Sequence, residues 1–308
     1  MKYQDLLVFF VFLFLSQPSS AGILEKALSA CTMYLEKPYL KLMEANENET
    51  LELNASEVDG ENFRETPFTL SVGKRLGAGY LAQAVIVTNI SDAEIEEKIR
   101  FFDSRYFTGT MVAKIPHALR KVNLGYALLL SNSANEKEFA AFENMKEKTA
   151  KVETNSLFPK NPAWKKGALP VAPILGTIKT KRGLILMKAL VKGENLGDLA
   201  KRFAANGNVL PADLEEGLKS YYDFVQAVYA ETGFSTDIRP TNFVWLKDDT
   251  DEERKQLAFL GYSRPGLLAY EMGRVPFNKP QYIEAKGGHS FEKYKAEVID
   301  YLQRELRK

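Results

Sequence analysis

The sequence predicts an α+β fold of two lobes, with a sheet in the first lobe and helices in the second. Three observations predict it. Between Phe68 and Leu190, short runs of apolar and β-branched residues separated by turn residues are typical of strands, with one helical segment among them. From residue 199 to 232, apolar residues recur every three or four positions, as in packed helices. With 308 residues, 45% of them hydrophobic, each lobe can bury a core of its own.

The first residues have the pattern of a secretory signal peptide. Lys2 precedes an apolar run, Leu6–Leu15, and Pro18 and small residues up to Ala21 follow it. The run is shorter than the ~20 apolar residues that cross a bilayer, so we expect no stable membrane span. We expect cleavage after Ala21 and secretion or delivery to a bacterial cell envelope (periplasm). Two alternatives stay open: a membrane anchor, or lipid attachment at Cys31, which ends a lipoprotein-like Leu-Ser-Ala-Cys box.

The composition limits the classes of partner. Cys31 is the only cysteine, so the chain forms no internal disulfide, which is unusual for an exported animal protein and favours a bacterial one. The 41 Lys and Arg against 40 Asp and Glu give a net charge of +1, so we expect no nucleic-acid partner. His117 and His289 are too few for a histidine metal site. Sequons at Asn48, Asn54 and Asn89 leave glycosylation open.

Beyond the signal peptide (residues 1–21), we divide the chain into three segments. Residues 22–66 are interpreted as an N-terminal helix, 22–42, followed by an acidic linker, 44–65, that has no strand pattern. Residues 67–191 form the sheet lobe and residues 192–308 the helical lobe, with a crossing at Gly193–Leu196. We expect strands at 68–76, 82–88, 111–115, 171–177 and 184–190, and helices at 136–146, 199–203 and 214–232.

The residues 235–242, Ser-Thr-Asp-Ile-Arg-Pro-Thr-Asn, follow Gly233 at the end of the long helix. They resemble the protein kinase catalytic loop, H-R-D-x-K-P-x-N. The resemblance implies that Asp237 is the catalytic base, that Arg239 replaces the loop lysine and that Asn242 binds a metal ion. An aspartate after Gly233 could also organise a turn through its own backbone, but the register of the flanking helix and strand favours the kinase interpretation.

Two upstream segments extend this resemblance to the kinase small lobe. Gly77 and Gly79 match the glycine-rich turn whose backbone amides approach the ATP phosphates, and Val85 falls at the valine that covers adenine. Lys114, in Thr-Met-Val-Ala-Lys-Ile-Pro, matches the lysine that binds the α- and β-phosphates. The fold implied is therefore a protein kinase-like, two-lobed fold with an antiparallel sheet in the N-terminal lobe and a reduced helical C-terminal lobe.

A glutamate on the following helix should pair with Lys114. Glu138 is preferred because Glu138 and Phe142 reproduce the form E-x-x-x-F. Glu136 and Glu143 are alternatives, and the three could also be a solvated helix face.

The segment 183–202 resembles the kinase hinge and the first helix of the large lobe. The resemblance implies that backbone groups around Lys188 to Leu190 receive adenine. An edge strand followed by a capped helix would have the same appearance.

The segment 257–265, Leu-Ala-Phe-Leu-Gly-Tyr-Ser-Arg-Pro, departs from the family. Matched to the strand and Asp-Phe-Gly triplet of kinases, it puts Phe259 in the place of the metal-binding aspartate. The resemblance then implies a pseudokinase that binds ATP, binds magnesium weakly and transfers phosphate weakly or not at all. Ser235 and Thr236 replace the His-Arg pair, and the remaining chain is short for a large lobe.

Two other functions stay open. An active atypical kinase for a protein or small molecule would recruit a carboxylate from the acidic run that follows the loop. A module that has kept only the scaffold would bind a protein partner without nucleotide. The sequence identifies neither partner nor substrate. The acidic run contains Asp248, Asp249, Asp251 and Glu252.

Overall fold

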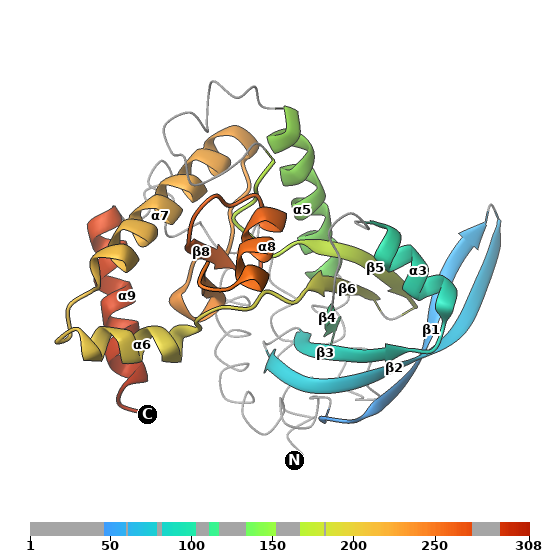
Figure 1. Cartoon of the computed structure of the whole chain (residues 1–308). Helices are drawn as coiled ribbons and strands as arrows, with labels where there is room; N and C mark the ends of the chain where they lie inside the picture. The colour runs from blue at the N-terminus through green and yellow to red at the C-terminus, as the bar shows by residue number, and fades with distance from the viewer. Residues whose placement is uncertain are drawn as a thin grey trace, which may run out of the picture. The chain divides into compact units, whose positions relative to one another are not determined.

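Figure 1 shows the computed structural model of the chain. Apart from Ala78, the described residues belong to one compact unit, residues 45–77 with 81–308. The predicted signal peptide, the helix 22–42, Cys31, Gly79, His117 and His289 lie outside the described residues. The structure describes residues 46–59, 61–78, 82–102, 111–116, 134–151, 167–181, 183–272 and 290–308.

The sheet is a closed barrel with the strand order β1-β2-β3-β4-β6-β5 (Figure 1). Its interior is filled by fully buried apolar side chains, among them Leu70, Val85, Ile115 and Ile185. The pairs β1–β2, β3–β4, β4–β6, β5–β6 and β1–β5 are antiparallel. The strands are β1 (Thr50–Asp59), β2 (Asn62–Ala78), β3 (Ala82–Ile90), β4 (Met111–Pro116), β5 (Ile174–Thr180) and β6 (Gly183–Ala189).

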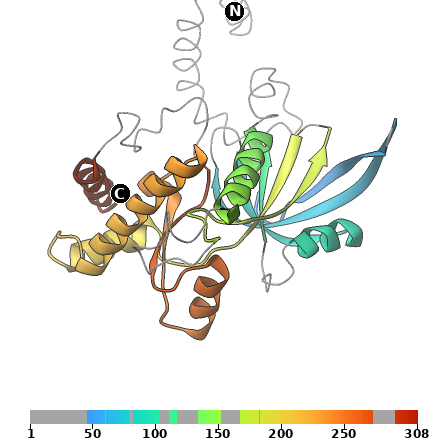
Figure 2. The same ribbon diagram turned by 90° about the horizontal axis from the view of Figure 1, so that it is seen from above.

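Two helices cover the outside of this barrel. Helix α3 (Ala93–Phe102) packs on β5, where Gly176 lets the helix approach closely: a Cβ at Gly176 would lie 3.1 Å from Ile99 Cα. Helix α5 (Ala134–Lys151) packs beside β4 and β6 (Figure 2). Because side chains alternate across a strand, one face of β4 fills the barrel and the other faces α5.

The second half of the chain is mainly helical. Helix α7 ends at Gly233, whose φ of +73° is the left-handed conformation that glycine accepts without strain. A core of apolar residues from α6, α7, β7, β8 and α9 holds these elements together. They are α6 (Leu196–Ala205), α7 (Ala212–Thr232), the 3₁₀ turn η2 (Pro240–Asn242), β7 (Phe243–Leu246), α8 (Asp251–Leu260), β8 (Gly266–Ala269) and α9 (Phe291–Glu305).

The predicted α+β fold, an antiparallel sheet followed by a helical region, is confirmed by this architecture. The prediction that residues 44–65 form a linker is wrong, because β1 and the start of β2 occupy most of this stretch. Leu51, Leu53 and Ala55 alternate with polar residues and pack against the barrel core, while the polar residues face outward. The many acidic residues of this segment obscured the alternation of apolar and polar residues that is typical of a strand.

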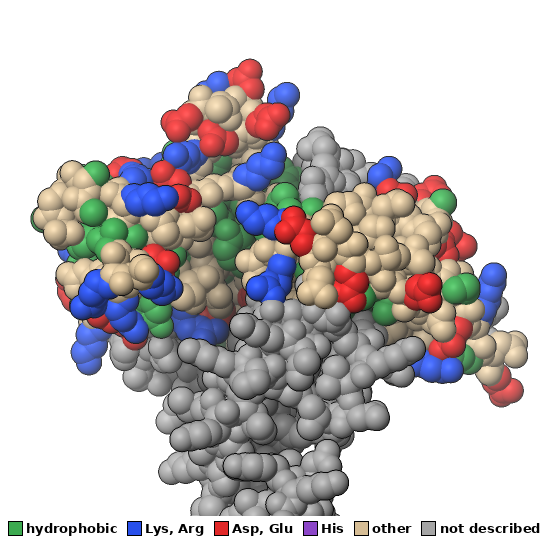
Figure 3. Space-filling view, turned by 90° about the horizontal axis from the view of Figure 1, so that it is seen from below, with side chains coloured by type: hydrophobic (Ala, Val, Ile, Leu, Met, Phe, Trp, Pro, Cys, Tyr) green, Lys and Arg blue, Asp and Glu red, His purple; other side chains and the backbone are tan. Residues whose placement is uncertain are grey.

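Both signs of charge are interspersed on the described part of the face in Figure 3. This agrees with the net charge of +1. Within the described ranges, none of the helices combines the length with the apolarity that a bilayer crossing requires.

Candidate functional site

Lys114 lies on the face of β4 that is turned toward α5. Its neighbours Ala113 and Ile115 point into the barrel and are fully buried. Lys114 Nζ lies 2.5 Å from Glu138 Oε2 and 2.9 Å from Glu271 Oε1. The predicted contact between Lys114 and Glu138 is therefore present, and of the three candidate glutamates Glu138 makes it.

The side chain of Lys188 also binds Glu138, and the sequence did not predict this contact. Its Nζ lies 2.9 Å from Glu138 Oε1 and donates to the carbonyl oxygen of Tyr270 at 2.5 Å. Glu138 thus binds one ammonium group with each carboxylate oxygen. We call Lys114, Lys188, Glu138 and Glu271 the ionic cluster; the side chains of Lys114, Glu138 and Lys188 are 13%, 8% and 7% exposed.

The contacts of the ionic cluster keep Lys114 and Glu138 charged although these two side chains are buried. Burial alone opposes the ionisation of Glu138, but the charges and hydrogen bonds of Lys114 and Lys188 outweigh it and lower the pKa of Glu138 from 4.5 to about 2. Burial likewise disfavours the Lys114 ammonium, yet Glu138 and Glu271 raise its pKa above the ordinary value of 10.5. A lysine whose ammonium group is kept charged and fixed in this way can bind an anion.

The loop 235–242 runs beside the segment that carries Glu271. The backbone N–H of Asp237 donates to the Glu271 carbonyl at 3.0 Å, and the N–H of Tyr270 donates to the Asn242 carbonyl at 2.7 Å. A buried tyrosine fixes the loop from the helical core: the Tyr294 hydroxyl donates to the Ile238 carbonyl at 2.9 Å. Asp237, Asn242 and Glu271 therefore lie on neighbouring backbone segments.

Asp237 is bound by Arg239 of the same loop. The guanidinium Nε donates to both carboxylate oxygens, at 2.8 and 3.1 Å, and Nη2 also donates to Oδ2. The Asp237 side chain is 11% exposed and that of Arg239 43%. Arg239 thus stands beside the predicted base, where the resemblance puts the loop cation.

The prediction that Phe259 takes the place of the metal-binding aspartate is wrong. Phe259 lies in helix α8, which is inserted between β7 and β8, and it packs against apolar core residues. The strand that pairs with β7 is β8, Gly266–Ala269, and Glu271 follows it. A carboxylate, not a phenyl ring, therefore stands after this strand and contacts Lys114.

Two signals in the sequence could have revealed this register. Thr250 and Glu253 have the spacing of a helix capping box, and in the structure each side chain accepts from the other's backbone N–H. The apolar run 266–269 is followed by Tyr-Glu-Met-Gly, in which an acidic residue precedes an apolar residue and glycine.

Val85 does not lie where the resemblance placed it. It pairs with Ala113 and is fully buried in the barrel interior. Since paired residues share a face, Ala84 and Ile86, which pair with Lys114 and Val112, lie on the side of the ionic cluster instead. The position that the resemblance gives to Val85 therefore belongs to a neighbouring residue of β3.

The predicted adenine segment has different contacts from those expected. The Ala189 N–H donates to the Pro173 carbonyl at 3.1 Å, and Leu190 is half-buried. The Gln256 side chain of α8 binds both backbone groups of Lys192, at 2.8 and 2.7 Å. Helix α8 therefore holds the segment after β6. Gly77 is the penultimate residue of β2, with open space where a Cβ would stand.

Two residues of the kinds that bind magnesium, Glu271 and Asn242, lie on adjacent backbone segments. Among the described residues no three His, Cys, Asp or Glu side chains gather as a metal site. Magnesium in nucleotide sites commonly takes one or two protein carboxylate or amide ligands and completes its shell with phosphates and waters. Glu271 and Asn242 supply that number of donors on adjacent segments.

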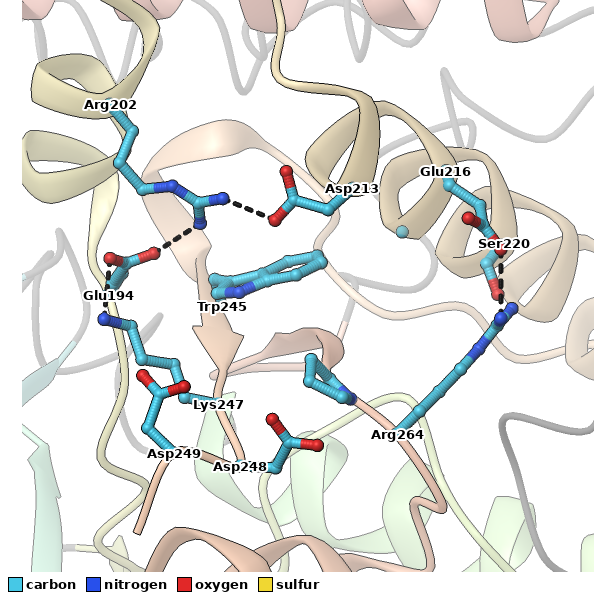
Figure 4. Close-up of a pocket in the computed structure, with 12 residues that line it drawn as sticks. Glu194, Arg202, Asp213, Glu216, Ser220, Trp245, Lys247, Asp248, Asp249 and Arg264 are labelled. Atoms are coloured by element: carbon cyan, nitrogen blue, oxygen red, sulfur yellow. Dashed lines mark hydrogen bonds and ion pairs between the residues drawn. The ribbon is translucent and has the colours of Figure 1, made fainter. Parts of the chain in front are cut away.

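A separate pocket of about 400 Å³ lies among α6, α7 and β7 (Figure 4). Arg202 bridges Glu194 and Asp213 at 2.7 and 2.5 Å above Trp245, and Lys247 also contacts Glu194 at 2.9 Å. Most of the charged side chains that line this pocket form ion pairs with one another. It shares no lining residue with the ionic cluster.

No protein-family model and no curated protein matches the sequence. Among solved structures, the chain is similar to the kinase domain of Mycobacterium tuberculosis PknI, with TM-score 0.36 and 13% identity over 74% of this chain and 70% of that one. A double mutant of that domain gives a TM-score of 0.37 at 13% identity, covering 74% and 69%. The BubR1 kinase domain gives 0.36 at 14% identity, covering 85% of this chain and 64% of that one.

The architecture agrees with the protein kinase-like fold that the sequence resemblance implies. A sheet with a paired lysine and helix glutamate is followed by a helical region, a loop 235–242 and the hairpin β7–β8, in the order of protein kinases.

Proposed function

We propose that this chain binds magnesium and ATP at the ionic cluster and transfers the γ-phosphoryl group to a hydroxyl group. The observation that carries the proposal is Glu271, a carboxylate that contacts Lys114 and lies beside the loop with Asp237 and Asn242. When bound, magnesium supplies positive charge that offsets the negative charge of the phosphates.

Lys114 would bind the phosphates, because its ammonium is buried, charged and fixed by Glu138. Glu271 would leave Lys114 to serve as a metal ligand together with Asn242. The open space beside Gly77, near the end of β2, leaves room for phosphates to approach the backbone.

Asp237 would accept the proton of the attacking hydroxyl group. The hydroxyl oxygen forms a bond to the γ-phosphorus as the bond to the β-γ bridging oxygen breaks, and ADP leaves. Arg239, which binds the Asp237 carboxylate, would hold it in place and offset the charge that develops on the transferred group.

Glu271→Gln tests the proposed metal site. The change removes the negative charge and keeps the volume, so magnesium-dependent ATP affinity in calorimetric titration should fall by about tenfold or more. Glu252→Gln is the control, because that side chain is 88% exposed on α8. Equal ATP affinity in both variants and the parent protein would rule out Glu271 as a metal ligand.

A pseudokinase that binds nucleotide without transfer is the second candidate. The bidentate hold of Arg239 on Asp237 favours it, because both carboxylate oxygens already accept hydrogen bonds from the guanidinium instead of from a substrate hydroxyl group. Ser235 and Thr236 in place of the His-Arg pair point the same way. In this case ATP binding persists and no phosphate is transferred.

We also propose that the protein is exported, which rests on the apolar run and the small residues before Gly22. N-terminal sequencing of the protein recovered outside the cytoplasm should begin near Gly22. Recovery with Met1 intact, or with lipid on Cys31, would exclude cleavage after Ala21.

A further inference from the structure

Lys188 lies on the same face of the sheet as Lys114. In the ladder between β4 and β6, Lys114 pairs with Leu186 and Val112 pairs with Lys188. Residues two apart on a strand share a face, so both lysines project toward α5. Val112, which pairs with Lys188 on the neighbouring strand, lies on the same face.

A buried lysine needs compensation, and Lys188 finds it in two other elements. Its ammonium binds Glu138 of α5 at 2.9 Å and the Tyr270 carbonyl, one residue before Glu271, at 2.5 Å. The side chain is 7% exposed. Lys188 thus ties β6 to α5 and to the segment of the proposed metal ligand.

The charges of the ionic cluster balance as the structure stands, with two lysines against two glutamates. If Glu271 bound a metal ion instead of Lys114, the two ammonium groups would face the single carboxylate of Glu138, and these three side chains would carry one net positive charge. Without Lys188, the charges of Lys114 and Glu138 would cancel and leave no net charge. The additional positive charge therefore comes from Lys188.

We propose that Lys188 is a positioning residue that binds the second carboxylate oxygen of Glu138, adds a positive charge beside Lys114, and makes the site favour nucleotides with more phosphate groups. The inference rests on the proposed nucleotide site. Because the added attraction is electrostatic, it grows with the charge of the phosphate chain and weakens with salt.

Calorimetric titration of AMP, ADP and ATP with magnesium tests this for the full protein and for Lys188→Met. The loss of affinity should increase from AMP to ADP to ATP and reach about tenfold or more for ATP. Lys188→Arg should recover most of it, because the charge is kept. Lys192→Met is the control, since that side chain is 72% exposed.

Lys188→Gln is the second variant, because its amide still donates to Glu138 or Tyr270 while the charge is gone. An equal loss for the three nucleotides, no loss, or unfolding of both uncharged variants would give Lys188 a purely structural role and overturn the proposal. Absence of ATP binding by the parent protein would instead refute the nucleotide site itself. If the uncharged Lys188 variants bind the nucleotides and keep the parent protein's preference for ATP, the role of Lys188 is refuted and the nucleotide site is not.

Discussion

Glu138→Ala is expected to lower the free energy of unfolding by about 3–5 kcal/mol. The change removes the carboxylate that binds Lys114 and Lys188 and leaves two buried ammonium groups near each other. Glu271 compensates only Lys114. Removal of one partner of a buried ion pair costs far more than removal of a surface charge.

Urea denaturation measures this effect. Glu147→Ala is the matched control, because it removes the same side chain from an exposed position of α5 and should change the stability by less than about 0.5 kcal/mol. Similar stabilities of the two variants would contradict the buried, charged state of the ionic cluster.

The same carboxylate predicts a pH dependence. The pKa of Glu138 is lowered from 4.5 to about 2 in the folded protein. Its contribution to stability is therefore complete above pH 4.5 and is lost as the pH falls from 4.5 toward 2. The stability of Glu138→Gln should decline less over this interval than that of the parent protein.

Asp237→Asn is expected to reduce phosphoryl transfer by about 10²–10⁴-fold, because the amide cannot accept the proton of the attacking hydroxyl group. ATP affinity should change little, since the side chain contacts Arg239 and not the ionic cluster. Release of ADP from magnesium and ATP, with hydroxyl compounds as acceptors, measures the rate.

Asp249→Asn, an exposed change in the separate pocket, is the control and should leave the rate as it was. Equal rates in the two variants would mean that Asp237 is not the base. A parent protein that binds ATP and releases no ADP with any acceptor would support the pseudokinase.

Much of the fold and part of the site could be predicted from the sequence. Strand and helix patterns located β4, α5 and α7, and the motif around Lys114 led to its contact with Glu138. These patterns are local, because the periodicity of a strand or helix depends on neighbouring residues. The loop around Asp237 was found for the same reason.

The errors concern relations between distant segments. The sequence pattern predicts Phe259 at the metal position, but the inserted helix α8 shifts the register of everything after β7. Val85 was misplaced by a single residue, which exchanges the two faces of a strand. Lys188 has no motif: its role appears only when β6, α5 and the Tyr270 carbonyl come together.

A crystal structure with magnesium and a non-hydrolysable ATP analogue tests the central claim most directly. The account predicts phosphate oxygens within hydrogen-bonding distance of Lys114 Nζ, and a metal ion bound by Glu271 and Asn242. A nucleotide bound away from Lys114, or a metal ion held by Asp248 or Asp249 instead, would contradict it.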